Sequence, residues 1–413
     1  MKILYISFDP PYFPGGTGGE TRQYHLVREM AKCHEFHYVG PRYEGVRLWI
    51  LEQFFRKLIM PPPRSFIERV CAFVVKRLDL RYPKLVQQYE WLRMTLMPLI
   101  LEALATEQYD LIHVEHTNIA HWLHELDSKV PKILSSENVK TVIWERYYLH
   151  AKGFERRRFY RDYLRFQEYE STFLRDYDCV IAVSEKDRDT FREFTQDSVP
   201  LFVVPNGCDT DYFQQIEPVS DQFELVFTGT MQYRPNAEAM LFFCREIYPK
   251  ILAKVPRCRL KIVGNKPPSE VRALEKLGDI EVTGFVDDVR PYMASAAVVV
   301  VPLLSGSGTR LKILEAMAMG KAVVATTVGA EGIDYTNGRD IIIAEDPESF
   351  AENVIALLAD RPKREILGKN ARELAEQKYS WQSSAVSLEK AYRFVADKTS
   401  RKVSGETSLR NDI

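Results

Sequence analysis

The chain has 413 residues, of which 46% are hydrophobic and 27% charged, so it is long enough for two or three globular domains with separate cores. Its net charge of −1 gives no overall electrostatic attraction for nucleic acid. The six cysteines form no CxxC pair and no Cys/His cluster, which argues against a zinc site and favours free thiols in a reducing compartment.

The sequence shows no pattern typical of a signal peptide or a membrane-spanning helix. The opening "MKILYISFDPPYF" has a short apolar core and an early Asp9, which is not typical of a signal peptide. The longest apolar run, "AAVVVVPLL", has about half of the ~20 residues that span a bilayer. We therefore expect a cytoplasmic protein without a transmembrane helix, with peripheral attachment to the inner face of the membrane as a further option.

Short β-branched runs alternate with helical patterns along the whole chain. Continuous apolar strands separated by helices are typical of parallel sheets covered on both faces. The first half has strand candidates at 2–7, 36–39, 110–114, 132–136, 179–184 and 201–205. The alternation restarts after a polar, turn-rich stretch, with candidates at 224–229, 259–264, 280–284, 298–302 and 322–326.

The restart predicts an α/β fold with two doubly wound parallel-sheet domains. Its expected parts are a first domain over 1–205, a linker over 206–222, a second domain over 223–380, an amphipathic helix over 381–398 and a disordered tail over 399–413.

Residues 47–105 interrupt this alternation and predict a helical insertion in the first domain. The segment lacks clear strand signals and holds ten cations against five acids, with large apolar residues between them, as in "LWILEQFFRKLIM". Two interpretations remain open, because periodicity alone does not separate them. The helices either bury their apolar face in the protein core, or they present a surface to anionic lipid.

The loop "FPGGTGGE" (13–20) follows the first strand and opens the first helix. It fits neither the dinucleotide fingerprint GxGxxG nor a P-loop, because no GK[ST] closes it. Glycines at Gly15, Gly16 and Gly18 allow a ligand to approach the backbone, and a helix N-terminus favours an anion. The alternative is a flexible turn between strand and helix.

A second glycine loop lies in "VPLLSGSGTRLKILEAMAMG" (301–320), between a buried strand and a helix. Ser307 or Thr309 is expected to cap a helix that begins near Arg310. The N–H groups of Gly308, Thr309 and Arg310 would then face a phosphate, since ligands of doubly wound sheets sit at the carboxyl ends of strands.

Three charged side chains follow the same loop. Arg310 and Lys312 add positive charge for a phosphate, and Glu315 can accept hydrogen bonds from the vicinal hydroxyls of a ribose. The alternative for Glu315 is an ordinary solvated helix acid. Its apolar neighbours ("ILEAMAM") favour the ligand interpretation, because a buried acid needs a donor partner.

The stretch "DLIHVEHTN" places His113, Glu115 and His116 at the end of a strand. His113 and Glu115 share one face of the strand, where a histidine is more often a satisfied core residue. A metal site is a poor interpretation, because two of the three residues are neighbours that point in opposite directions. His116, at the carboxyl end, is a candidate for a ligand site.

Taken together, the motifs of the second half resemble the retaining glycosyltransferases of the GT-B fold, family 4 (glycosyl transferases group 1). The resemblance rests on "VPNGCDTDYF" (204–213), "FTGTMQYRPNAEAMLFF" (227–243), "VTGFVDDVRPYMASA" (282–296), the loop over 301–332 and "YSW" (379–381). The first half contributes "FPGGTGGETRQYHLVREMA" and "VIAVSEKDR". The most similar group is the sugar transferases associated with exopolysaccharide and PEP-CTERM/exosortase loci.

This resemblance implies two Rossmann-like domains facing a cleft, with a nucleotide-diphosphate sugar bound mainly to the second domain and an acceptor to the first. It implies a hexosyl transfer with retention at the anomeric carbon, without a metal or other cofactor. In such enzymes the leaving phosphate oxygen takes the acceptor proton on the same face of the sugar, which fits the lack of a carboxylate pair spaced for double displacement.

The sequence departs from the family pattern at three positions. The first acid of the family's Glu-x7-Glu motif falls on Ser307, whereas the second is Glu315. The diphosphate-gripping Arg and Lys after the second domain's first strand fall near Thr230 and Arg234, and a His of the first domain falls near Glu137. The resulting set of catalytic candidates is Glu137, Asn138, His116, Arg310 and Lys312. The donor-binding candidates are Gly15, Gly16, Gly18, Gly229, Thr230, Arg234, Ser307, Gly308, Thr309, Leu311 and Glu315.

The expected function is transfer of a sugar from a nucleotide diphosphate to a lipid-linked or polysaccharide acceptor, in exopolysaccharide or cell-surface glycan synthesis. The expected partners are the nucleotide sugar, that acceptor and an anionic membrane surface, with no nucleic acid. Two alternatives remain: a non-catalytic nucleotide- or sugar-binding partner of a glycan assembly complex, and a nucleotide-sugar epimerase of the same fold.

Overall fold

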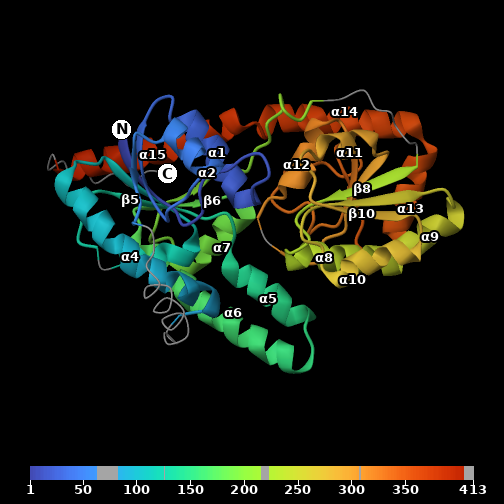
Figure 1. Ribbon diagram of the computed structural model, residues 1–413, viewed down its shortest axis with the longest axis horizontal. Coiled ribbons are helices and arrows are strands. Elements are labelled where there is room, and N and C mark those ends of the chain that lie inside the picture. The colour runs from blue at the N-terminus through green and yellow to red at the C-terminus, as the bar shows by residue number, and fades with distance from the viewer. Residues whose placement is uncertain (63–81, 125, 215–222, 307, 404–413) are drawn as a thin grey trace. The chain divides into compact units, whose positions relative to one another are not determined.

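The computed structural model describes residues 1–62, 82–124, 126–214, 223–306 and 308–403 (Figure 1). The chain divides into two compact units, each described here by itself. The first comprises Met1–Val204 together with Ser384–Ile413, and the second comprises Pro205–Ser383.

The first unit is built on a seven-stranded parallel sheet in the order β3-β2-β1-β4-β5-β6-β7. Its strands are β1 (Lys2–Ile6), β2 (Glu35–Val39), β3 (Lys57–Ile59), β4 (Leu111–Glu115), β5 (Lys132–Ser135), β6 (Cys179–Ala182) and β7 (Leu201–Val203). The inner strands are buried along nearly their whole length, as continuous apolar runs predict for a sheet covered on both faces.

Helices and short helical turns connect these strands. They are α1 (Gly18–Met30), α2 (Val46–Phe54), α4 (Lys84–Thr106), η1 (Thr117–Leu123), α5 (Lys140–His150), α6 (Gly153–Phe173), η2 (Leu174–Asp176) and α7 (Glu185–Thr195). Helix α15 (Trp381–Val403) follows the second unit in the chain and belongs to the first unit from Ser384 onward. Figure 1 shows α5 and α6 side by side as a hairpin whose turn lies away from the sheet of the first unit.

The second unit is built on a six-stranded sheet in the order β10-β9-β8-β11-β12-β13, again with parallel pairing. The strands are β8 (Glu224–Thr228), β9 (Arg259–Val263), β10 (Ile280–Gly284), β11 (Val298–Val301), β12 (Ala322–Ala325) and β13 (Ile342–Ile343). The helices are α8 (Arg234–Phe242), η3 (Phe243–Ile247), α9 (Tyr248–Lys254), α10 (Ser269–Arg272), η4 (Ala273–Leu277), α11 (Arg290–Ser295), α12 (Leu311–Ala318), α13 (Pro347–Ala359) and α14 (Arg361–Lys378).

In Figure 1, helices α11, α12 and α14 lie on one face of the second sheet and α8, α9 and α10 on the other. The two parallel sheets with their helices confirm the predicted fold class of Rossmann-like, doubly wound domains. Every strand predicted from sequence is present. Two short edge strands, β3 and β13, were not predicted, because three and two residues are too few to show a periodic pattern.

The segment over 47–105 is less purely helical than predicted, since β3 extends the first sheet at its edge beside β2. The apolar face of α4 packs into the core, where Val86, Leu96 and Ile100 are fully buried. The core interpretation therefore holds for α4. Residues 63–81 of this segment lie outside the described residues.

Two predicted boundaries differ from the structure. Residues 206–214, expected as a linker, belong to the second unit, where the Cys208 N–H donates to the carbonyl of Tyr379 at 2.7 Å. Residues 399–403, expected in a disordered tail, continue helix α15, because the first helix-breaking residue comes only with Gly405. Residues 404–413 lie outside the described residues.

Candidate active site

The strand order of the second unit creates a topological switch point at β8. From β8 the chain proceeds outward to β9 and β10 on one side, and β11, β12 and β13 follow on the other side. In an open parallel sheet the loops at the carboxyl ends of the two central strands then diverge and leave room for a ligand. Here those are the loops that follow β8 and β11.

The loop after β8 requires glycine at its first position. A Cβ on Gly229 would lie 2.6 Å from Nζ of Lys312 and 2.8 Å from Nδ2 of Asn236, and the backbone φ of +143° is also unfavourable for other residues. The Asn236 amide donates to the carbonyl of Thr230 at 2.9 Å and accepts from Nζ of Lys312 at 2.8 Å. These contacts bring the ends of β8 and the first turn of α12 together.

Lys312 is the cation of this junction. It is half-buried, and its Nζ lies 3.9 Å from the centre of the Phe227 ring. Burial lowers the pKa of Lys312 to about 7, with the charge of Arg310 acting in the same direction and Glu315 opposing it. A bound diphosphate would reverse this shift, because a nearby anion favours the charged ammonium.

Glu315 lies one turn further along α12 and is half-buried. Its carboxylate has no hydrogen-bond or ion-pair partner among the residues that the structure describes, although Lys312 is close enough to act on it electrostatically. Burial raises the pKa of Glu315 to about 7, against the opposing effect of Lys312. An unpaired, half-buried carboxylate at this edge of the sheet is available to accept hydrogen bonds from a ligand.

The predicted cap of α12 is wrong. The N-cap residue is Arg310, without a side-chain cap hydrogen bond, and the helix begins at Leu311. Thr309 is buried and its hydroxyl donates instead to the carbonyl of Gly332 at 3.4 Å. Ser307 lies outside the described residues.

The N-terminus of α12 nevertheless retains its anion-binding character. Among the described residues, the N–H groups of Leu311 and Lys312 have no hydrogen-bond acceptor, and the helix dipole adds positive potential, whereas the N–H of Ile313 donates to the carbonyl of Arg310 at 3.0 Å. These amides follow directly after the predicted set of Gly308, Thr309 and Arg310. Arg310 donates from Nη1 to the carbonyl of Gly308 at 2.9 Å, which folds its guanidinium back over the loop.

Two other predicted donor residues are placed differently. Thr230 is exposed and its hydroxyl bonds to the side chain of Asn265. Arg234 begins α8 and forms an exposed ion pair with Glu238, with Nε and Oε1 2.5 Å apart. The positive charge of Arg234 is therefore already partly neutralised within its own helix, and the structure brings Lys312, not Arg234, to the end of β8.

The glycine loop of the first unit is closed by a capping box. Thr17 caps α1 by accepting from the N–H of Glu20 at 3.3 Å, and Glu20 accepts from the N–H of Thr17 at 2.8 Å. A Cβ on Gly16 would lie 2.5 Å from the carbonyl oxygen of Tyr12, so the loop passes close to its own backbone. Gly15 and Gly18 are exposed in the same loop.

Gly19, which was not among the predicted site residues, leaves space in this loop for the side chain of Glu137. A Cβ there would lie 2.4 Å from one carboxylate oxygen of Glu137 and 2.5 Å from the other. The carboxylate of Glu137, from the loop after β5, therefore lies against the N-terminus of α1. The four-glycine pattern was the available signal for a close approach, but it did not indicate that a side chain of the same chain fills the space.

His116 completes this cluster. Its Nδ1 is 2.6 Å from Oε1 of Glu137, and the side-chain amide nitrogen of Gln23 lies 3.0 Å from its Nε2. The Phe8 ring lies over the imidazole with centroids 4.5 Å apart. Burial lowers the pKa of His116, but the charge and hydrogen bond of Glu137 outweigh burial and raise it. For Glu137, burial raises the pKa and His116 outweighs it, lowering it to about 2.

His113 is a satisfied core residue, as its strand position favoured. Its Nε2 lies 3.0 Å from Oε1 of Glu115 and its Nδ1 2.7 Å from the hydroxyl of Tyr392, while Tyr5 donates to Glu115 at 3.0 Å. All four side chains are buried. Asn138 accepts a hydrogen bond from the Ser136 hydroxyl through its backbone carbonyl at 2.8 Å, and so shapes the turn that carries Glu137.

Two further observations concern the residues that the structure describes. No group of three or more His, Cys, Asp or Glu side chains in that part of the chain is arranged to hold a metal ion. None of the described helices combines the length and the hydropathy that crossing a bilayer requires.

Comparison with known families gives two matches. Residues 17–207 match the family model of the glycosyl transferase 4-like domain, and residues 222–360 match that of glycosyl transferases group 1. With the two parallel-sheet units, these matches define the class: the chain carries both domains of a glycosyltransferase of the GT-B type.

Particular relatives are more distant. A protein of 44.6 kDa from the cps region of Klebsiella pneumoniae is 22% identical over 43% of this chain, and a phosphatidyl-myo-inositol mannosyltransferase of Mycolicibacterium smegmatis is 28% identical over 47%. The matched region spans 52% of the length of each of these two relatives.

Solved structures resemble the chain over nearly its whole length. Sucrose-phosphate synthase from Thermosynechococcus elongatus has a TM-score of 0.73 at 19% identity, covering 96% of this chain and 99% of that one. The Anabaena protein HepE in complex with UDP and glucose has a TM-score of 0.62 at 14% identity, covering 95% and 99%. At these identities the likeness concerns the fold alone.

Proposed function

We propose that the chain transfers a hexose from a nucleotide-diphosphate donor to a lipid-linked or polysaccharide acceptor, with retention of the anomeric configuration. This proposal rests on two side chains of opposite charge on helix α12. An unpaired carboxylate, Glu315, and a half-buried cation, Lys312, sit one turn apart at the switch point of the second sheet. A nucleoside diphosphate needs both: an acceptor for the ribose hydroxyls and positive charge for the phosphates.

In the proposed reaction, the bond between the anomeric carbon and the donor phosphate breaks, and a bond from the acceptor oxygen forms on the same face. The acceptor proton passes to the leaving phosphate oxygen. Lys312, Arg310 and the first-turn amides of α12 stabilise the negative charge that develops there. Neither a metal nor another cofactor takes part. The first unit is proposed to bind the acceptor, with His116, Glu137 and Asn138 orienting the sugar or the acceptor.

The relatives supply the chemical setting of the proposal. The mannosyltransferase acts, by its name, on a phosphatidylinositol lipid, and the Klebsiella protein is encoded in a cps region. HepE was solved with UDP and glucose, and also with UDP-glucose. These names support a nucleotide sugar as donor and a lipid-linked or cell-surface glycan as acceptor.

The donor site is tested by thermal shift with a panel of nucleoside diphosphates, because a ligand that binds the native state raises the unfolding midpoint. At least one member of the panel should raise the midpoint of the parent and raise that of Glu315→Gln much less. If none of the nucleoside diphosphates moves the parent midpoint at millimolar concentration, the proposed donor site is wrong.

A further inference from the structure

The hairpin formed by α5 and α6 carries a concentration of positive charge at its turn. Between Arg146 and Arg165 the sequence has seven Lys or Arg residues and two carboxylates, whereas the whole chain has a net charge of −1. One of the two carboxylates, Asp162, is buried. Five of the cations are exposed: Lys152, Arg156, Arg157, Arg158 and Arg161. Within the described part of the chain, none of these five forms an ion pair with a carboxylate.

Large apolar side chains are exposed on the same hairpin, two near its turn and one further along α6. Phe154 is 83% exposed, Leu149 59% and Leu164 44%. The hairpin does not need them for its own packing, because Trp144 lies between the helices with its ring 5.8 Å from that of Phe159 and 5.9 Å from that of Phe166. A group of exposed apolar side chains rimmed by charged residues is typical of an interaction surface.

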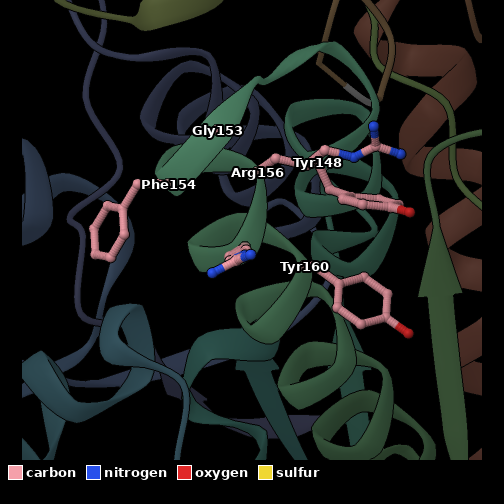
Figure 2. Close-up of a pocket in the computed structure, with 6 residues that line it drawn as sticks. Tyr148, Gly153, Phe154, Arg156 and Tyr160 are labelled. Carbon is pink, nitrogen blue, oxygen red and sulfur yellow. The ribbon is translucent and has the colours of Figure 1, made fainter.

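An open pocket of about 500 Å³ lies at the turn (Figure 2). It is lined by Tyr148, Gly153, Phe154, Arg156, Arg157 and Tyr160. The guanidinium of Arg156 lies 5.1 Å from the centre of the Tyr148 ring, and the rings of Tyr148 and Tyr160 are 4.9 Å apart. Figure 2 shows Phe154 pointing away from these two tyrosines. Cations and phenol hydroxyls therefore line one side, and a bare phenyl ring stands on the other.

We propose that the hairpin tip, residues 148–164, docks on an anionic lipid surface. The exposed arginines contact headgroup phosphates, and Phe154 enters the interfacial layer. Charge complementarity favours an anionic partner, and each cation near such a surface contributes to binding. The apolar ring selects a lipid layer over a nucleic acid or an acidic protein surface, because only the lipid layer offers an apolar phase beside the phosphates.

This docking surface differs from the one that the sequence suggested at 47–105, whose long helix α4 buries its apolar face in the core. It is also independent of the proposed transfer reaction, since binding to a lipid surface needs neither the donor nor turnover. A failure of lipid docking and a failure of glycosyl transfer are therefore separate results.

The test is flotation of the full chain with vesicles of phosphatidylcholine alone, or of phosphatidylcholine and phosphatidylglycerol in equal parts. The parent should float with the phosphatidylglycerol vesicles at low salt and be released as salt rises. The triple variant Arg156→Gln, Arg157→Gln, Arg161→Gln should lose on the order of a hundredfold in partitioning. Phe154→Ala should lose roughly tenfold, and Phe154→Trp should bind like the parent.

Matched controls come from exposed residues elsewhere. The triple variant Lys254→Gln, Lys363→Gln, Lys390→Gln removes the same charge, and Phe285→Ala removes an aromatic ring that is 65% exposed in the second unit. Both controls should partition like the parent. The single variant Arg157→Gln gives a graded loss that remains measurable if the triple variant is poorly folded.

Three results would overturn the proposal. The first is equal binding of the parent to both vesicle types, or binding to neither. The second is flotation of the tip variants like the parent. The third is release of the parent from vesicles by soluble glycerol phosphate as completely as by salt. The last result would identify a pocket for a small anion instead of a surface for lipid.

Discussion

Nδ1 of His116 and Oε1 of Glu137 lie 2.6 Å apart and join the ends of two neighbouring strands. The two residues are 21 positions apart in sequence, but β4 and β5 pair in parallel, so their carboxyl ends meet at one edge of the first sheet. Burial disfavours the charged form of both side chains, but the charge of each partner stabilises the charged form of the other. The contact therefore favours the charged form of both side chains, directly beside the N-terminus of α1.

Glu137→Gln should lower the pKa of His116 and the stability of the chain. A raised histidine pKa contributes stability that is complete below the unfolded value of 6.5 and is lost as pH rises through the folded value. A lowered carboxyl pKa contributes stability above 4.5 that is lost as pH falls towards about 2. The loss should therefore be largest between pH 4.5 and 6.5, at about 3 kcal/mol.

Urea unfolding at several pH values and an NMR titration of His116 measure these two effects. Asp176→Asn, which removes the partner of the exposed His124, is the control and should leave the His116 titration unchanged. An unaltered His116 pKa in Glu137→Gln would show that the ion pair does not control this histidine.

Gly19→Ala should displace the Glu137 carboxylate, because the added Cβ would lie 2.4 Å from one of its oxygens. We expect the His116 pKa to fall as it does in Glu137→Gln, and acceptor-dependent turnover to fall with it. Gly15→Ala is the matched control in the same loop: its Cβ meets nothing within 4 Å, although its φ of +87° adds backbone strain. Equal His116 titrations in the two alanine variants would contradict the proposed role of Gly19.

Glu315→Gln should separate stability from donor binding. A carboxyl pKa raised to about 7 stabilises the fold below pH 4.5, and this contribution is lost as pH rises through 7. At pH 8 the variant should therefore be more stable than the parent by roughly 1–3 kcal/mol. Its affinity for the donor should be weaker by roughly tenfold to a hundredfold, because the ribose hydroxyls lose a charged acceptor.

Chemical denaturation and calorimetric titration of the same two proteins give both quantities. A variant that is less stable than the parent at pH 8, or that keeps the parental donor affinity, would mean that Glu315 serves the fold and not the ligand.

The affinity for a nucleoside diphosphate should pass through a maximum near pH 7. Below it, Glu315 is increasingly protonated and accepts poorly; above it, Lys312 loses the proton that its interaction with phosphate requires. At pH 8, binding should take up a proton, which calorimetry in buffers of different ionisation enthalpy detects. Lys312→Arg keeps its charge at all these pH values, so it should abolish the uptake and the alkaline loss of affinity. Persistence of both in Lys312→Arg would assign them to another group.

Long, continuous apolar runs were enough to predict most of both sheets, because burial on both faces leaves a pattern in every strand except the short edge strands β3 and β13. Local chemistry that depends on contacts distant in sequence was not predictable. The hydroxyl of Thr309 was expected at the helix cap, but it bonds to the carbonyl of Gly332. Arg234 was expected at the phosphates, but it pairs with Glu238 one turn along its own helix.

The same reason explains two contacts that the glycine loops did not indicate. Nothing in the first glycine loop indicated that Gly19 leaves space for Glu137, which comes from a loop more than a hundred residues later. Likewise, Gly229 was predicted to approach a ligand, whereas its missing side chain first makes room for Lys312 and Asn236. Glu315 and Lys312 were expected on the same helix, and they lie one turn apart on α12 because spacing along a helix is a local property; their roles at a ligand site stay predictions.

The central claim is that the Glu315 and Lys312 site drives sugar transfer, and a product assay tests it most directly. The purified chain is incubated with nucleotide-diphosphate sugars, EDTA and a membrane lipid extract, and both the free nucleoside diphosphate and the sugar in the lipid or glycan fraction are measured. The account predicts that one donor yields both products in equal amounts only when the extract is present, and that Glu315→Gln lowers this rate by about tenfold or more. Nucleotide binding without any product, or an isomerised nucleotide sugar without transfer, would contradict it.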